Sequence, residues 1–420
     1  MTRHDVLVLG GGPAGSCAAT RLARAGRSVL LLERERFPRF HVGESLLPYN
    51  AEIFDELGLT PKLAAAGFPV KRGAQFHLGN GAKGTSFVFG QGRFTRHAEA
   101  YQVERSRFDE ILLRHAADSG AEVREGVAVE RVEAGPDSVV VTAADGSRFE
   151  GRLVVDATGR GNLTGNQEGV RVPNPRLRKL AVFAHYDGVR VDPDGRAGDT
   201  VIVRQRDHWF WLIPLRLDGD GRGRVSVGVV MDRDDFAKGG RTGAEALDLR
   251  IAASPPVAER LRGAVRVSEV HVTSDFSYRN ATFWSPRCVR TGDAAGFIDP
   301  IFSSGVFLAM FSARAAADAA MAALDSGGNG APEFRAYEER VRRALGVYQE
   351  MVDGFYTQPF MELFLEPRAK LGLAAAVNAI LAGELEGGWR LRWRLRLFFL
   401  LVRLQARHPL VPRFSFDPVP

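Results

Sequence analysis

Short apolar runs and one glycine-rich turn open the chain. Residues 4–9 form an apolar run that predicts a buried strand, and residues 16–25 carry small apolar side chains at helical spacing. Gly26 ends this predicted helix, and residues 28–32 form a second apolar run with Glu33 at its end. Strand, helix and strand in this order predict a βαβ unit with two parallel strands.

The pattern changes several times along the rest of the chain. Alternating or apolar runs predict strands at residues 123–132, 138–142, 153–156, 180–186, 200–204, 209–215, 224–231 and 287–292. Helical spacing predicts helices at residues 46–57, 102–115, 306–324 and 332–355, with more helix after them. The alternation is strongest between residues 180 and 231, which predicts a β-rich second lobe. The fold class is therefore α/β, with a helical C-terminal region behind a glycine-rich linker.

The turn after the first strand has glycine at all three positions of the G-x-G-x-x-G pattern, namely Gly10, Gly12 and Gly15. In a dinucleotide-binding unit the first glycine permits a tight turn and the second lets the backbone approach a pyrophosphate. The third lets the helix pack closely on the strand. Glu33 stands where a carboxylate accepts hydrogen bonds from a ribose. We expect a nucleotide at this turn; a glycine-rich turn in a purely structural unit is the alternative.

Composition narrows the class of protein. The chain has 420 residues, of which 45% are hydrophobic, so we expect two or three lobes with large cores. Cys17 and Cys288 are too few for a disulfide framework or a cysteine metal site, and no metal is expected. Neither a signal peptide nor an apolar run of roughly 20 residues is apparent, so we expect a cytoplasmic protein without a transmembrane segment.

The net charge leaves two interpretations open. It is +6, from 56 Lys and Arg against 50 Asp and Glu. The arginine-rich composition of a GC-rich genome explains it, and a basic surface for an acidic partner, such as a carrier protein, is the alternative. No DNA-binding motif or basic tail accompanies the charge, so no nucleic-acid partner is expected.

Three segments together resemble the FAD enzymes that are built like aromatic hydroxylases: residues 10–15 with Glu33, residues 156–159, and residues 291–296. Each segment alone could be an ordinary loop, but all three stand in the order found in those enzymes. The resemblance implies a Rossmann-like FAD-binding domain interrupted by a β-rich substrate domain. It places the first at residues 1–68, 103–175 and 285–325, the second at 69–102 and 176–284, and a helical C-terminal region at 326–420.

The same resemblance implies which residues contact FAD. Asp293 would bind the ribityl chain, Arg105 would lie near the flavin, and the helix after Gly305 would direct its positive end toward the flavin. The implied contacts are Gly10, Gly12, Pro13, Ala14, Gly15, Glu33, Arg39, Glu44, Ser45, Arg105, Asp156, Asp293 and Gly305.

An aromatic strand carries the pattern W-x-W-x-I-P, formed by Trp209, Trp211, Ile213 and Pro214. Residues i and i+2 of a strand point the same way, and Pro214 is expected to stop the strand. Core packing explains such a strand. The pattern also resembles the signature of flavin-dependent halogenases, in which the two indoles keep the oxygenated flavin from reacting directly with the substrate.

Lys71 lies in the stretch K-x-G-A-x-F at the start of a predicted strand. A lone lysine is ordinarily a solvated surface group. This stretch nevertheless resembles the one that carries the active-site lysine of the halogenases. Residues 37–48 and 296–306 resemble the same enzymes, and the resemblance covers roughly residues 1–325.

The resemblance implies a two-component halogenase that uses FADH2. Reduced FAD reacts with O2, chloride or bromide near Ser304 and Gly305 is oxidised to hypohalous acid, and the acid travels to Lys71. Lys71 hydrogen-bonds the acid or forms a haloamine, and electrophilic halogen reaches an electron-rich ring. No second G-x-G-x-x-G unit is apparent, so a separate flavin reductase is expected as a partner.

One position departs from the free-tryptophan halogenases, which carry a glutamate where this chain has Phe302. The departure favours a pyrrole- or phenol-type halogenase of natural-product (antibiotic) biosynthesis, with a substrate that is free or bound to an acyl or peptidyl carrier protein. The alternatives are an FAD-dependent monooxygenase or double-bond reductase of the same fold, and a flavin-binding accessory protein. Lys71 and the W-x-W-x-I-P pattern argue against the first of these.

Residues 389–407 alternate arginine with apolar residues. One helical face would hold Leu391, Leu395, Phe398 and Val402, and the arginines outside it are Arg392, Arg396 and Arg403. A helix packed on the core explains this pattern. A substrate lid, a docking site for a carrier protein and a membrane contact are the alternatives.

Overall fold

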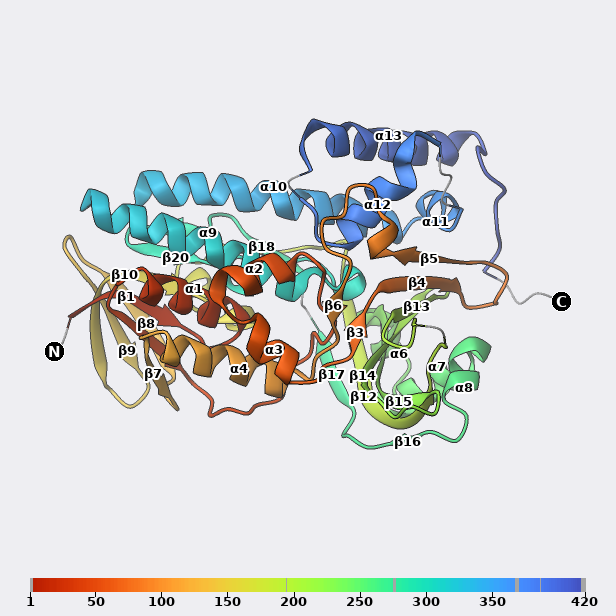
Figure 1. The fold of residues 1–420 in the computed structure, drawn as a ribbon, viewed down its shortest axis with the longest axis horizontal. Coiled ribbons are helices and arrows are strands. Elements are labelled where there is room, and N and C mark those ends of the chain that lie inside the picture. The colour runs from red at the N-terminus through yellow and green to blue at the C-terminus, as the bar shows by residue number, and fades with distance from the viewer. Residues whose placement is uncertain (1–2, 194, 275–276, 367–369, 386, 417–420) are drawn as a thin grey trace.

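Two eight-stranded sheets carry the fold, one toward each end of the long axis of the molecule (Figure 1). The structure is a computed structural model that describes residues 3–193, 195–274, 277–366, 370–385 and 387–416. Long helices cover the first sheet, and the C-terminal helices lie above the second sheet in the same view.

The first sheet joins the N-terminal βαβ unit to two later segments. Its strands are β1 (Arg3–Leu9), β2 (Val29–Glu33), β7 (Glu122–Glu125), β8 (Val129–Ala134), β9 (Val139–Ala143), β10 (Arg148–Asp156), β19 (Trp284–Ser285) and β20 (Cys288–Arg290). The main path runs β19-β20-β10-β1-β2-β7, and β1 is parallel to both β10 and β2. Leu9 pairs with Leu32 and with Asp156, so the carboxyl ends of three strands meet at one edge. Ligands bind at this edge of parallel sheets.

Helices from both ends of the chain pack around this sheet. They are α1 (Pro13–Arg24), α2 (Asn50–Leu57), α3 (Thr60–Ala65), α4 (Arg105–Asp118), α5 (Leu163–Gln167), α9 (Ser304–Ser326) and α10 (Ala331–Phe355). α1 packs on α9 and α4, and α9 packs on α10. The start of α9 is thereby held against the start of α1, although the two are far apart in sequence.

α9 is long and apolar enough to cross a membrane by length and composition, contrary to the expectation that no run approaches this length. In the structure 72% of its most apolar window is buried. Ala313, Ala316 and Ala317 are fully buried, and such small residues let the neighbouring helices approach closely. α9 is a core helix of the fold.

The second sheet is mostly antiparallel. Its strands are β4 (Gly73–Leu78), β5 (Gly84–Val88), β12 (Lys179–Arg190), β13 (Thr200–Arg204), β14 (His208–Leu217), β15 (Arg222–Asp232), β16 (Val265–Arg266) and β17 (His271–Ser274). The path runs β16-β12-β15-β14-β13-β4-β5, with β17 beside β12 and with β4 parallel to β13. The helices of this part are α6 (Arg233–Lys238), α7 (Gly243–Ala252) and α8 (Pro255–Arg260). Leu247 and Val257 of these helices join a core formed by this sheet.

Smaller elements connect the two sheets. β11 (Arg171–Pro173), β18 (Tyr278–Asn280) and β21 (Gly296–Phe297) form one small sheet, and β3 (Val70–Lys71) pairs with β6 (Ala100–Tyr101). The C-terminal region ends in α11 (Gln358–Phe364), α12 (Leu373–Leu381) and α13 (Gly388–Arg407). α13 follows the predicted pattern, since Leu391, Leu395 and Phe398 are buried while the arginines outside that face are exposed.

Three predicted helix starts differ from the structure by three or more residues. α4 begins at Arg105 rather than at residue 102. α1 begins at Pro13 rather than at residue 16, because proline is favoured in the first turn of a helix. α2 begins at Asn50 rather than at residue 46. The backbone N–H of Leu46 instead donates to the carbonyl of Tyr101, with an N···O distance of 3.0 Å, and this contact keeps the segment extended.

Pro214 does not stop its strand, contrary to the prediction. β14 continues to Leu217, and the pairing with β15 shifts register between Pro214 and Arg216. A proline is tolerated beside such a bulge because the ladder is already interrupted there.

Candidate active site

One cavity of about 510 Å³ begins at the carboxyl edge of the first sheet and reaches β14 of the second sheet. Its walls come from the turn before α1, the loop after β2, the end of β10 and the start of α9. The predicted site residues that line it are Gly10, Gly12, Pro13, Ala14, Glu33, Arg39, Glu44, Ser45, Arg105, Trp209, Trp211, Ile213, Asp293 and Gly305. The fold therefore brings most of the predicted site into one space.

The three glycines of the turn have different neighbours. Gly10 has a φ of +99°, and a Cβ there would lie 2.4 Å from the carbonyl oxygen of Ala157. A Cβ on Gly15 would lie 1.8 Å from the carbonyl oxygen of Gly10. These two glycines are needed for packing, and Gly15 does not line the cavity. A Cβ on Gly12 would meet only the guanidinium of Arg39 at 3.4 Å, so its backbone stays open to a phosphate in the cavity.

Glu33 is fixed at the cavity edge by two backbone amides. Its Oε2 accepts a hydrogen bond from the N–H of Gly11 at 2.6 Å, and its Oε1 accepts one from the N–H of Glu35 at 2.8 Å. The side chain is 5% exposed. A carboxylate held in this way keeps lone pairs for the hydroxyls of a ribose.

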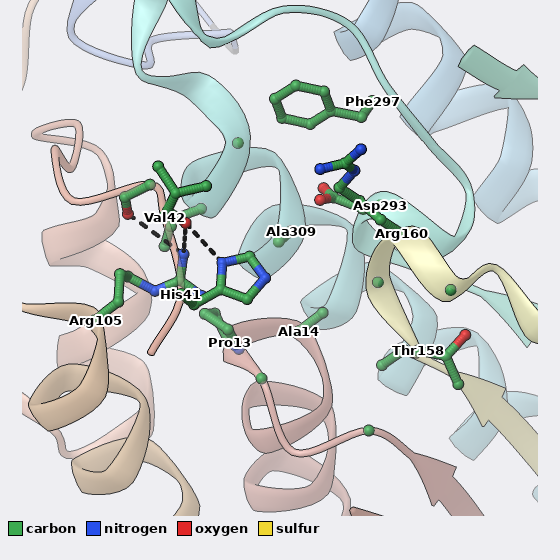
Figure 2. Close-up of a pocket in the computed structure, with 18 of the residues that line it drawn as sticks. Pro13, Ala14, His41, Val42, Arg105, Thr158, Arg160, Asp293, Phe297 and Ala309 are labelled. Atoms are coloured by element: carbon green, nitrogen blue, oxygen red, sulfur yellow. Dashed lines mark hydrogen bonds between the residues drawn. The ribbon is translucent and has the colours of Figure 1, made fainter. Parts of the chain in front are cut away.

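Arg39 and Arg105 line the cavity and share one buried carboxylate behind its wall. Oδ1 and Oδ2 of Asp109 accept hydrogen bonds from Nε and Nη2 of Arg105 at 2.7 and 2.9 Å, and Nη1 of Arg39 lies 3.1 Å away. Arg105 also donates to the carbonyl of Val42 at 2.7 Å (Figure 2). Two guanidinium groups against one carboxylate leave this wall positive, which suits an anionic cofactor. Sequence reasoning missed Asp109, although its position four residues after Arg105 on a predicted helix was a signal.

Asp293 and Arg160 lie on the other side of the cavity, with the start of α1 between the two sides (Figure 2). Burial raises the pKa of Asp293 to about 6, and the charges of Arg160 and Arg105 oppose this rise. Arg160 was not predicted, although it directly follows the matched segment that ends at residue 159. A carboxylate here can accept hydrogen bonds from hydroxyl groups of a bound cofactor.

Asp156 is not among the residues that line the cavity, which corrects the prediction of a direct contact. Its buried carboxylate accepts hydrogen bonds from the N–H and hydroxyl of Thr158 at 3.0 and 2.6 Å. It accepts two more from the N–H and hydroxyl of Thr164 at 2.9 and 2.6 Å. With both oxygens occupied, Asp156 orients the end of β10, and the residues that follow it form the cavity wall.

Glu44 brings a carboxylate with one unpaired oxygen to the cavity. The side chain is 2% exposed, and its Oε1 lies 2.7 Å from Nε2 of His185. Burial lowers the pKa of His185, but the hydrogen bond and charge of Glu44 outweigh it and raise that pKa above its usual value. Oε2 has no hydrogen-bond partner within the part of the chain that the structure describes. Because buried polar atoms are normally paired, this oxygen fits a donor group on a bound cofactor.

These features test whether FAD suits the cavity. The open backbone at Gly12 and the positive wall match a pyrophosphate, and Glu33 matches a ribose. Asp293 matches a chain of hydroxyl groups, and Glu44 supplies a further hydrogen-bond acceptor in the cavity. The residues present therefore fit FAD.

Lys71 is 1% exposed, so the interpretation as a surface lysine is wrong. Its Nζ donates to Oγ of Ser45 at 2.9 Å and to the carbonyl of Leu46 at 3.1 Å, and it lies 5.4 Å from the ring centroid of Phe89. Burial lowers the pKa of Lys71 to about 7, against a smaller opposing effect of Asp199. Lys71 does not line the cavity, but its partner Ser45 does. Lys71 thus lies one residue behind the cavity wall.

Trp209 and Trp211 project from one face of β14 into the end of the cavity, as their spacing predicts. Their ring centroids are 6.0 Å apart at an angle of 52°. Nε1 of Trp209 donates to Oη of Tyr356 at 3.0 Å, and Nε1 of Trp211 donates to Oγ of Ser226 at 3.2 Å. Both indoles are therefore fixed by a bond at the polar end of the ring. Pro214, the last member of the motif, is not among the cavity residues.

A second, very small cavity lies at the start of α9. It has a volume of about 10 Å³ and is lined by Ser304 and Gly305, and Gly305 also faces the large cavity. A space of this size approaches that of one water-sized species. Ser303 adopts a left-handed backbone with φ 54°, and Ser304 begins the helix after it. The amides of the first helical turn have no partners within the helix and carry the positive end of its dipole.

The family described as tryptophan halogenase matches residues 5–99 and 92–360. The 1H-pyrrole-2-carbonyl-[peptidyl-carrier protein] brominase of Pseudoalteromonas luteoviolacea is 33% identical over 365 residues, which cover 85% of this chain and 86% of that protein. The corresponding chlorinase of Pseudomonas fluorescens is 30% identical over 416 residues, which cover 92% of this chain and 91% of that protein.

The solved structure of the flavin-dependent brominase Bmp2 superimposes with a TM-score of 0.84 at 29% identity, covering 97% of this chain and 100% of that chain. The family match, the relatives and the solved structure point to the same family. The chain belongs to the flavin-dependent halogenase family, whose enzymes use FAD, O2 and a halide for halogenation in natural-product biosynthesis.

Proposed function

We propose that this halogenase passes electrophilic halogen from the FAD cavity to a separate aromatic substrate through Lys71. The observation that carries the proposal is the burial of Lys71, with a pKa of about 7 and a hydrogen bond to the cavity residue Ser45. Amine and ammonium are then both populated near neutral pH. The ammonium can donate a hydrogen bond to hypohalous acid, and the amine can accept halogen from it.

When bound in reduced form, FAD would supply, together with O2, the two-electron oxidant that converts halide to hypohalous acid. Gly12, Glu33, Arg39, Arg105 and Asp293 would hold the cofactor, because they line the large cavity with an open backbone, carboxylates and guanidinium groups. The small cavity beside Ser304 and Gly305 would hold chloride or bromide. The free amides and the positive helix end there favour an anion.

The substrate that we propose is a pyrrole or phenol. Phe302, which stands where free-tryptophan halogenases carry a glutamate, is 3% exposed. Its ring lies among aromatic side chains, with centroids 6.4 Å from Phe76 and 5.8 Å from Phe355. This environment offers apolar contact rather than a carboxylate base. A pyrrole or phenol ring is activated by its own N–H or O–H and needs less help from such a base.

A carrier protein and a flavin reductase are the proposed partners. Two relatives act on pyrrole-2-carbonyl groups held by a peptidyl carrier protein, and both align over most of this chain. The outward face of α13 carries exposed Arg392, Arg396 and Arg403, and α13 contains no acidic residue. Guanidinium groups pair well with carboxylates and phosphates, so this face suits an acidic carrier protein with its phosphodiester arm.

One reaction tests the proposed function. The protein is supplied with FAD, a flavin reductase, NADH, O2 and chloride or bromide, together with pyrroles and phenols that are free or loaded on a carrier protein. We expect mass spectra of the ring product to show the isotope pattern of the added halide. Full consumption of reduced FAD with oxygenated products only, and no halide in any of them, would sink the proposal.

Lys71→Ala tests the proposed role of Lys71 in the same reaction. We expect ring halogenation to be lost while FAD affinity and O2 consumption remain, because Lys71 lies outside the FAD cavity. Lys62→Ala is the matched control, since Lys62 is a surface lysine paired with Asp118. Ring halogenation that persists in Lys71→Ala at the rate of the control would remove Lys71 from this role.

A further inference from the structure

A chain of hydrogen bonds connects Trp209 to the loop before α9 through the C-terminal region. Nε1 of Trp209 donates to Oη of Tyr356 at 3.0 Å, and Oη of Tyr356 donates to Oδ2 of Asp299 at 2.9 Å. Oδ1 of Asp299 accepts a hydrogen bond from the N–H of Ile301 at 3.0 Å. Tyr356 directly follows α10, so the C-terminal region reaches the end of the FAD cavity at this point.

The chemistry of these groups fixes the direction of the chain. An indole N–H only donates, and an ionised carboxylate only accepts, so the phenol between them must do both. Burial raises the pKa of Asp299 to about 7, and its bonds from Ile301 and Tyr356 act in the opposite direction. Above pH 7 the carboxylate is therefore the acceptor. Trp209 and Asp299 are each 1% exposed, so a missing phenol would leave both without easy access to water.

Further contacts hold the rings of Trp209 and Tyr356. The ring of Phe355 stands edge-on to that of Trp209, with centroids 6.2 Å apart at 82°. Nζ of Lys179 lies 4.5 Å from the ring centroid of Tyr356. A rotation of the Trp209 ring would break the bond to Tyr356 and disturb the contact with Phe355 together.

We propose that Tyr356 is a positioning residue for Trp209 and that Asp299 orients the Tyr356 hydroxyl. The pair holds the indole across the end of the FAD cavity and so determines how much of the oxidant made there is used for halogenation. This catalytic consequence rests on the proposed function. The position of the indole does not rest on it and is measured separately.

Indole signals in an NMR spectrum test the positioning in the protein without turnover. The chain has five tryptophans, so ¹⁵N-labelled indoles give few signals, and the loss of one in Trp209→Phe assigns Trp209. We expect Tyr356→Phe to shift the Trp209 signal and to speed its exchange with water about tenfold. The matched control is Tyr348→Phe, since Tyr348 is a buried tyrosine of α10 whose hydroxyl donates to the carbonyl of Ile380 at 3.0 Å.

Coupling measured at pH 8 tests the catalytic consequence. The readout is halogenated product formed per reduced FAD oxidised, with FAD affinity measured alongside. We expect Tyr356→Phe to lower this ratio about 3- to 10-fold at unchanged FAD affinity, and Tyr348→Phe to leave it unchanged. In a Trp209→Phe background, Tyr356→Phe should have no further effect, because its partner is already gone.

Several outcomes would overturn the inference. A Trp209 signal that stays in place in Tyr356→Phe excludes the positioning role. An equal loss of coupling in Tyr348→Phe, or a further loss in the Trp209→Phe background, shows a general structural effect instead. Normal coupling in Trp209→Phe alone contradicts the proposed role of that indole, while the NMR result still decides the positioning. If Tyr356→Phe fails to fold, Asp299→Asn replaces it, and it should shift the Trp209 signal in the same direction.

Discussion

The groups in contact with Lys71 are neutral, so they accept hydrogen bonds from its ammonium but do not balance its charge. Its two hydrogen-bond acceptors are the hydroxyl of Ser45 and the carbonyl of Leu46, and the ring of Phe89 lies beside them. Burial therefore outweighs the attraction of Asp199 and lowers the pKa of Lys71 to about 7. A lysine in this setting can serve as donor or as nucleophile without a neighbouring base.

The lowered pKa of Lys71 predicts a pH dependence of stability. Between about pH 7 and the usual lysine value of 10.5, the unfolded chain binds a proton that the folded protein has lost. The free energy of unfolding should therefore rise with pH in this window, relative to a variant without the amine. We expect Lys71→Met to lack this rise. Urea unfolding of both proteins at pH 7, 8 and 9 measures the difference, and parallel stability curves would contradict the prediction.

The sequence predicted the direction of a side chain correctly where the spacing within one strand determines it. It did not predict hydrogen-bond partners that come from distant parts of the chain. The spacing of Trp209 and Trp211 requires both indoles to point the same way, and they do. The carboxylate of Asp156 was assigned to the cofactor because its strand end approaches the cavity. Thr164 takes up one side of that carboxylate, and no pattern at residue 156 reveals this. Tyr356 was missed for the same reason, because its partners are Trp209 and Asp299.

The junction of β1, α1 and β10 shows how one turn serves both packing and binding. Gly15 is needed because the carbonyl of Gly10 fills the place of its side chain, whereas the space beside Gly12 is left for a ligand. The same sequence pattern therefore contains positions of two kinds. Only the three-dimensional neighbours distinguish them.

A pair of glycine variants separates these two kinds of position. Gly15→Ala should destabilise the protein by roughly 3 kcal/mol, because the strand and helix must move apart. Gly12→Ala should leave the melting temperature of the FAD-free protein nearly unchanged and should weaken FAD binding strongly. Thermal unfolding and titration with FAD measure both effects. Unchanged FAD affinity in Gly12→Ala would show that the cofactor does not approach this backbone.

Strong patterns predicted whole elements well. Residues 200–204 were predicted as a strand and form β13 with the same bounds. The run is buried along its full length, so its apolar residues mark both ends of the strand. The start of α2 was misplaced, because a contact from Tyr101 holds Leu46 extended. Contacts of this kind come from segments that are distant in sequence. The apolar pattern of the helix itself therefore does not predict them.

In the whole molecule, α13 lies on the outer side of the C-terminal region (Figure 1). Its residues Arg392, Arg396 and Arg403 are exposed. Replacing Arg392, Arg396 and Arg403 with glutamate should raise the KM for a carrier-bound substrate about tenfold, because like charges would then meet. The KM for a free pyrrole or phenol should not change. Added salt should raise the KM of the unmodified protein for the carrier-bound substrate, because salt screens the attraction between opposite charges.

A second triple variant controls for net charge. Arg131, Arg148 and Arg335 are exposed residues outside α13, and their replacement with glutamate changes the charge of the protein by the same amount. We expect this variant to keep the KM for the carrier-bound substrate. Equal losses in both triple variants would point to long-range charge rather than to docking on α13.

The parallel pairing of β4 with β13 also determines how far apart Lys71 and Trp209 lie. Lys71 precedes β4 by two residues, and Trp209 belongs to β14 on the other side of β13. Trp209 pairs with Arg204, and Arg204 is aligned with Leu78 of β4. Trp209 therefore lies two strands away from β4 and level with a residue seven positions after Lys71, which is roughly 20 Å along the strand direction. This separation is set by backbone hydrogen bonds, which insertions in surface loops do not alter. An insertion in a surface loop should therefore leave the distance between Lys71 and Trp209 unchanged.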